Sequence, residues 1–122
     1  MQKTVTIKRN NEFLRAYKRG KFFVGKFIIL YVLKNNVGMN RLGVSVSKKV
    51  GKSVKRNRLK RLVKESYRFY ESFIKDGIDM VFVLRNNEIM AEYTDIKKEM
   101  KFLLKKLNVF NQELWNCLKD SL

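Results

Sequence analysis

The chain has 122 residues, of which 28 are lysine or arginine and 11 are aspartate or glutamate, for a formal net charge of +17. This length favours a single domain, residues 1–122, whose core needs no metal or disulfide. With no histidine and one cysteine, Cys117, a zinc site and the commonest general base are both excluded. No apolar run is long enough to span a membrane or to form a signal peptide, and the lone cysteine indicates a reducing cytoplasm.

The positive charge is concentrated in one part of the chain. Residues 1–85 carry 22 basic and 5 acidic side chains, whereas residues 86–122 carry equal numbers of both. A concentrated positive field favours a polyanion as partner, with nucleic acid ahead of an anionic membrane.

Residues 10–20 are predicted to form a helix that is capped by Asn10 or Asn11 and ends at Gly20. Residues 21–34 predict one strand with apolar side chains on both faces and a bulge or bend at Gly25. Residues 41–48 predict a second strand. One face of it carries small side chains at 43, 45 and 47, which allows close approach of either a helix or a ligand.

The second half continues with a helix from Ser53 to about Phe73, a strand at 80–85, a helix that opens at Thr94 or Asp95, and a short helix in the tail. Asp76 and Asp79 flank Gly77 and Ile78 in a predicted Asp/Gly turn, so both are expected to be solvated. The order α-β-β-α-β-α predicts an α+β sandwich of a small sheet and helices. In the tail, Trp115 is expected to pack and Cys117 to be a buried thiol.

The segment KKVGKSVKRNRLKRLVKESYR, residues 48–68, contains ten basic residues and a single acid, Glu65. At helical spacing its apolar side chains form one stripe, and the opposite side carries Asn57 with Lys60, Arg61, Lys64 and Arg68. A merely solvated face would mix in acids for local pairing. Arginine forks and a helix N-terminus both suit phosphate groups, so the pattern indicates phosphate binding.

The sequence RLGVSVSKKVGKSVKRNRLKRLVKESYR, residues 41–68, resembles the signature region of the bacterial ribonuclease P protein family. The resemblance covers about residues 8–107 and leaves 108–122 as a C-terminal extension. It departs from the family at Lys64, where arginine is commoner, and at Tyr17, where phenylalanine is frequent. The residues that carry it are Lys48–Lys49, Val50–Gly51–Lys52, Arg56–Asn57–Arg58, Lys60–Arg61, Phe13, Gly20 and the stretch LYVL at 30–33.

The resemblance implies a fold like the second domain of ribosomal protein S5, with a left-handed β-α-β crossover. It implies that the chain helps a catalytic RNA to remove the 5′ leader from precursor tRNA, with ribonuclease P RNA and precursor tRNA as partners and no protein partner. The protein then holds no catalytic residue, metal site or cofactor, and the divalent metal, Mg²⁺, serves the RNA-catalysed reaction. Two alternatives are a ribosomal or chaperone-like RNA binder and a free-standing nuclease, which the missing histidine disfavours.

Site residues follow from the charge pattern and the resemblance together. Aromatic faces stack on unpaired bases with little sequence preference, which suits varied leaders, although Phe13 and Phe27 fit an ordinary core equally well. The residues expected to bind the catalytic RNA are Lys48, Lys49, Lys52, Arg56, Asn57, Arg58, Lys60, Arg61, Lys64 and Arg68. Those expected in a leader cleft are Phe13, Tyr17, Phe27, Ile29 and Tyr31.

Overall fold

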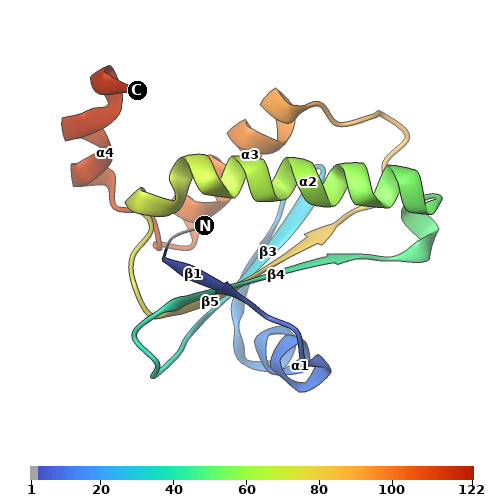
Figure 1. Cartoon of the computed structure of the whole chain (residues 1–122), viewed down its shortest axis with the longest axis horizontal. Coiled ribbons are helices and arrows are strands. Elements are labelled where there is room, and N and C mark those ends of the chain that lie inside the picture. Colours follow the sequence, from blue (N-terminus) through green and yellow to red (C-terminus); the bar gives the residue numbers. More distant parts are fainter. Residues whose placement is uncertain (1–2) are drawn as a thin grey trace.

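A five-stranded mixed sheet organises residues 3–122, the part of the chain that this computed structural model describes (Figure 1). Short 3₁₀ turns occupy Lys48–Val50, Glu71–Phe73 and Lys119–Ser121. The main elements are β1 (Thr4–Thr6), α1 (Asn10–Arg19), β2 (Lys21–Val24), β3 (Ile28–Lys34), β4 (Asn40–Val46), α2 (Ser53–Tyr70), β5 (Ile78–Leu84), α3 (Tyr93–Lys106) and α4 (Gln112–Leu118).

The strand order is β1-β4-β5-β3-β2, so the last strand in the sequence lies at the centre of the sheet. β5 pairs in parallel with β4 and antiparallel with β3, while β1 and β2 form the edges. Helix α2 connects the parallel neighbours β4 and β5, which makes a β-α-β crossover. The α+β class is confirmed, and the left hand of this crossover stays a prediction.

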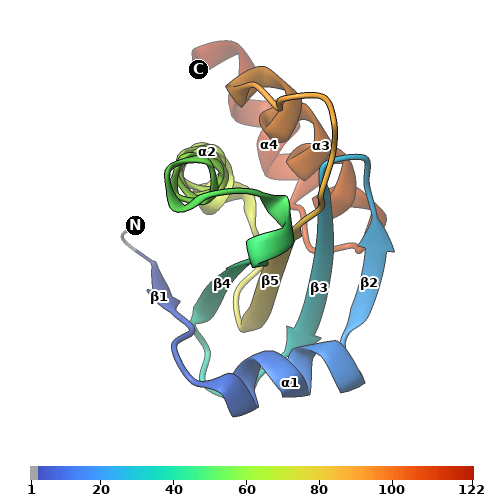
Figure 2. The same ribbon diagram turned by 90° about the vertical axis from the view of Figure 1, so that its right-hand side faces the viewer.

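The helices cover the two faces of the sheet unequally (Figure 2). Helices α2 and α3 pack on one face and form the main core with Leu30, Phe82 and Met100, all fully buried. Helix α1 lies on the other face, where Ala16 packs beside Val81. A strand with both faces covered needs apolar residues at successive positions, which explains the continuous apolar run of β3.

The predicted strand over 21–34 is wrong in one respect. It is a hairpin, because the chain reverses between Val24 and Ile28 and β2 pairs back onto β3. The short strand β1 was not predicted, and the helix predicted to reach Phe73 ends at Tyr70 before a 3₁₀ turn. Arg9, rather than an asparagine, occupies the N-cap of α1.

The C-terminal tail folds back onto the end of α2. The Trp115 ring packs edge-on against Phe73, with 5.1 Å between ring centroids, and the Lys101 ammonium lies 4.3 Å from the indole centroid. Trp115 therefore packs the tail down as expected. Cys117 is exposed, so its prediction as a buried thiol is wrong: α4 presents only one side to the core. No helix within residues 3–122 is long and apolar enough to cross a membrane.

Candidate nucleic-acid interface

Helix α2 separates its apolar and cationic residues onto opposite sides, as the periodicity predicts. Leu59, Leu62, Val63 and Ser66 are buried against the sheet and α3. The outward side forms a shallow hollow bordered also by Glu65. We call this side the basic face of α2, which consists of Asn57, Lys60, Arg61, Lys64 and Arg68.

Three predicted lysines lie at the entrance to α2. Lys48 and Lys49 are exposed in the 3₁₀ turn after β4, and Lys52 is exposed at the N-cap. Between them Gly51 has a φ of 153°, which side chains with a Cβ rarely adopt. The turn thus holds three ammonium groups beside the free N–H groups of the helix start, where an anion is favoured.

Arg58 and Arg56 are placed differently from the basic face. Arg58 donates a hydrogen bond of 3.0 Å to the carbonyl of Ala91 and lies 3.4 Å from the Glu92 carboxylate, so it ties α2 to the segment before α3. The Nε of Arg56 is buried and has no hydrogen-bond partner within residues 3–122. The buried Nε cannot reach a ligand, so Arg56 can offer only its terminal guanidinium nitrogens. Arg58, in contrast, already has protein partners.

On the opposite side of the sheet, α1 and β3 bring aromatic rings together. The Tyr17 and Tyr31 centroids are 4.9 Å apart with the rings edge-on, and Phe13 follows at 6.5 Å from Tyr17. A Cβ on Gly43 would lie 2.7 Å from the Phe13 ring, so this small residue admits α1, one of the two occupants that the sequence allowed.

Beside these rings the sheet is open. A hollow is lined by Phe13, Leu14 and Tyr17 from α1 and by Val44 and Ser45 from β4. The strand register places Ser45, Val83 and Ile29 in one row across β4, β5 and β3. We call this region the aromatic cleft, defined by Phe13, Tyr17, Ile29, Tyr31, Ser45 and Val83. Val83 was not predicted to lie here, although two-residue alternation along β5 puts it on the same face as Val81.

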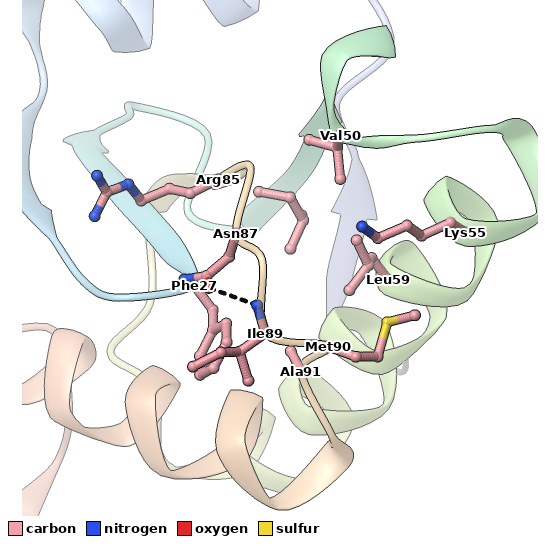
Figure 3. Close-up of a pocket in the computed structure, with 10 residues that line it drawn as sticks. Phe27, Val50, Lys55, Leu59, Arg85, Asn87, Ile89, Met90 and Ala91 are labelled. Carbon is pink, nitrogen blue, oxygen red and sulfur yellow. Dashed lines mark hydrogen bonds between the residues drawn. The ribbon is translucent and has the colours of Figure 1, made fainter.

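The structure does not bring Phe27 into the aromatic cleft (Figure 3). Phe27 precedes β3 in the hairpin turn and is buried on the α2 side, in a small hollow with Leu59 and Leu84. The prediction assumed that β3 extends back through residue 27, which would have put Phe27 on the same face as Ile29. Phe27 therefore takes the core role, and the other four predicted cleft residues remain together.

A partly buried ion-pair network joins α1 to the sheet. Arg41 of β4 donates two hydrogen bonds, of 2.7 and 2.6 Å, to the Asp79 carboxylate of β5, and it also pairs with Glu12 of α1. Burial alone would raise the pKa of Asp79, but hydrogen bonds from Arg41 and Asn35, with the charge of Arg41, lower it below its usual value. Asp79 is 1% exposed, so its prediction as a solvated turn residue is wrong.

The basic face and the aromatic cleft adjoin around β4. Val44 lines the hollow beside Phe13 and also a second hollow, which contains Lys60 and Lys64 of the basic face. A chain of nucleotides could therefore contact both surfaces. Residues 3–122 contain no group of three or more histidine, cysteine, aspartate or glutamate side chains placed to hold a metal ion.

Comparison with known proteins gives a consistent family. The Ribonuclease P family model matches residues 1–108. The ribonuclease P protein component of Clostridium botulinum (strain Loch Maree / Type A3) is 50% identical over 106 residues, covering 86% of this chain and 96% of that protein. The corresponding protein of Alkaliphilus oremlandii is 45% identical over 105 residues, covering 86% and 92%.

Solved structures agree with the sequence relatives. The Staphylococcus aureus RNase P protein superposes with a TM-score of 0.78 at 33% identity, covering 87% of this chain and 97% of that chain. The RNase P protein from Thermotoga maritima gives a TM-score of 0.74 at 28% identity, covering 83% and 96%. With its sheet, basic face and family match in agreement, the chain belongs to the ribonuclease P protein family, whose members are protein components of ribonuclease P.

Proposed function

We propose that this chain is the RNA-binding subunit of ribonuclease P, and that it assists the catalytic RNA in removing the 5′ leader from precursor tRNA. The observation that carries the proposal is the basic face of α2, where cations are gathered opposite a buried apolar stripe. Like charges at helical spacing repel one another. A polyanion that neutralises them would explain why they are clustered on this face.

The basic face binds phosphate groups of ribonuclease P RNA. Arg61 and Arg68 offer planar forks that match paired phosphate oxygens, and Lys64 adds a point charge between them. Lys48, Lys49 and Lys52 extend this contact to the helix start. Arg56 contributes through its terminal guanidinium nitrogens, since its Nε is buried, while Arg58 acts mainly by holding α2 against the segment at Ala91.

The aromatic cleft takes the unpaired leader of precursor tRNA. Stacking on Tyr17, Tyr31 or Phe13 is available to every base because each has a π-face, so the cleft tolerates leaders of any sequence. The cleft adjoins the basic face at Val44. A precursor tRNA that is bound by the catalytic RNA at the basic face can therefore extend its leader directly into the cleft.

The chemistry belongs to the RNA subunit in this proposal. Divalent metal ions such as Mg²⁺ activate water and stabilise developing charge on phosphate oxygens. In this proposal the protein contributes binding and orientation. Its one cysteine, which is exposed and unpaired, fits the reducing cytoplasm that we propose for the complex.

The test is to replace Arg61, Lys64 and Arg68 together by glutamine and to measure binding to the cognate ribonuclease P RNA across a salt series. We expect affinity to fall at least about tenfold, and the slope of log affinity against log salt to decrease by about two to three, because each lost phosphate contact removes about one unit. These residues are exposed, so the fold should survive.

The matched control is a triple glutamine variant of Lys98, Lys106 and Lys119, which removes the same charge from exposed positions on α3 and the tail. It should keep the wild-type salt slope. Equal slopes for wild type and the α2 variant would reject the assignment. Leader removal by the purified protein without RNA would also reject it, in favour of a protein nuclease.

A further inference from the structure

The edge strand β2 exposes apolar side chains next to the aromatic cleft. Phe22 is 56% exposed and Val24 is 47% exposed. Because side chains alternate along a strand, these two residues share a face, and Phe23 points to the other face, where its ring meets Phe102 of α3. Packing within the protein accounts for Phe23 but leaves the outer surface of Phe22 uncovered.

Phe22 continues the row of rings that crosses the sheet. It pairs directly with Tyr31 in the strand register, and their ring centroids are 5.3 Å apart with 31° between the ring planes. The rings of Phe13, Tyr17, Tyr31 and Phe22 thus form an unbroken series. The row of Ser45, Val83 and Ile29 across the sheet also continues into β2, because Ile29 pairs with Val24.

The surroundings of Phe22 are cationic. Lys18 and Arg19 are exposed at the end of α1, which lies on the same face of the sheet as Phe22. The exposed Lys21 precedes Phe22 in β2, with its side chain on the other face by alternation. No acid occurs between residues 13 and 64. An exposed aromatic ring flanked by cations is the arrangement that binds single-stranded nucleic acid, in which bases stack on rings and phosphates meet positive charge.

We propose that Phe22 and Val24 form an outer subsite of the aromatic cleft, which takes leader nucleotides farther from the cleavage site and stacks a base on Phe22. The inference rests on the proposed function, since it assumes that the cleft holds the leader. The direction rests on the proposed RNA contact: the catalytic RNA that cleaves the substrate is held at the basic face, which adjoins the cleft at β4, whereas β2 is at the far edge of the sheet. Nucleotides at Phe22 are therefore distal.

The test uses the holoenzyme reconstituted with the cognate RNA and a series of precursor tRNAs that differ only in leader length. For Phe22→Ala we expect wild-type affinity for short leaders and, beyond a threshold length, a loss of roughly 5- to 150-fold, the range for one stacked base. Affinity for mature tRNA should not change. Phe22→Trp should restore affinity for long leaders, whereas Phe22→Leu, which keeps apolar volume without a ring, should not.

Two further variants separate the possible outcomes. Phe23→Ala is the matched control, since it removes a neighbouring ring from the other face, and it should bind every leader as wild type does. Tyr31→Ala tests the cleft itself and should weaken binding at a shorter leader length than Phe22→Ala does. If Tyr31→Ala shows this dependence and Phe22→Ala shows none, the outer subsite is rejected and the proposed function stands.

If neither variant depends on leader length, the assignment of the cleft to the leader fails as well. A second copy of the chain pairing along the β2 edge would cover Phe22 and Phe23 alike. Equal effects of the two alanine variants, together with a change in oligomeric state by ultracentrifugation, would replace the subsite with such an interface.

Discussion

At the scale of single residues, Arg41 decides how α1 lies on the sheet. Its guanidinium joins Asp79 of β5 to Glu12 of α1, and Glu12 is next to Phe13 of the aromatic cleft. Asp79 is buried and the Arg41 side chain is 18% exposed, so removing Arg41 would leave a buried carboxylate without compensation. The contacts of Arg41 therefore contribute both to the stability of the fold and to the position of α1 at the aromatic cleft.

We expect Asp79→Asn to lower the free energy of unfolding near neutral pH by about 1.5–3 kcal/mol, the usual value for a hydrogen bond to a charged group. The folded-state pKa of Asp79 is lowered, so the stabilisation exists above its unfolded pKa, about 4, and is lost as the pH falls through the folded value. Urea unfolding at several pH values measures both.

The difference between wild type and Asp79→Asn should be constant above about pH 5 and should shrink as the pH falls below 4. Asp76→Asn is the control, because Asp76 is exposed. A difference that grows in acid would contradict the assignment of a lowered pKa to Asp79.

Several residues could not be placed from the sequence because their environment depends on distant partners. Asp79 resembles a turn residue until Arg41 is placed beside it, and Phe27 resembles a cleft residue until the hairpin is known. Arg58 belongs to the basic motif by sequence, but its contact with Ala91 depends on the tertiary approach of a segment 33 residues away. The outward positions of Arg61, Lys64 and Arg68, in contrast, could be predicted from the helical period alone.

At the scale of elements, Glu99 of α3 fixes the β2–β3 hairpin. Its carboxylate accepts hydrogen bonds from the backbone N–H groups of Lys26, at 2.6 Å, and of Phe27 and Ile28, at 2.8 Å each. A Cβ on Gly25 would lie 2.6 Å from the carboxyl carbon of Glu99 and 2.8 Å from the backbone oxygen of Ile28, so a larger residue at this position would displace the contact. The turn that carries β2 is thereby attached to α3.

Replacing Glu99 by alanine should therefore destabilise the protein by about 1.5–3 kcal/mol, because a charged acceptor is lost and turn N–H groups lose their partner. Amide hydrogen exchange should accelerate first in β2 and in the turn at residues 25–27. Glu113→Ala, at an exposed position of α4, should change neither. Uniform acceleration across the whole sheet would show that Glu99 has no specific role in the hairpin.

Sequence patterns predicted the elements with strong periodicity and missed those fixed by tertiary contacts. The amphipathic helices α1, α2 and α3 were found because their buried side chains recur every three or four residues. The β2–β3 turn contains no Asn-Gly or proline signal, and its anchor, Glu99, is 73 residues away from Lys26 in the sequence. Strand β1 has three residues, too few for a periodic pattern.

At the scale of the whole molecule, the charge of +17 is a cost to folding that the proposed RNA binding would offset. Salt bridges within residues 3–122 involve only Arg41 and Arg58 among the cations, so most of the positive charge is uncompensated. Mutual repulsion destabilises a compact state, and salt screens it over about 10 Å at 0.1 M.

We expect the melting temperature of the isolated protein to rise by a few degrees between 50 and 500 mM NaCl, while affinity for RNA falls over the same range. The glutamine variant of Arg61, Lys64 and Arg68 should melt higher than wild type at low salt and should respond less to added salt. Circular dichroism at 222 nm measures both. A melting temperature that falls as salt is added would contradict the repulsion argument.

The central position of β5 has a consequence for synthesis of the chain on the ribosome. Strands β3 and β4 follow each other in the sequence but do not pair, since each pairs with β5, which comes later. A nascent polypeptide that has emerged only as far as residue 77 can form two separate strand pairs, β1 with β4 and β2 with β3. The two halves can join only after residues 78–84 leave the exit tunnel. A translational pause before that point would leave the apolar β3 and β4 edges unpaired and accessible to chaperones.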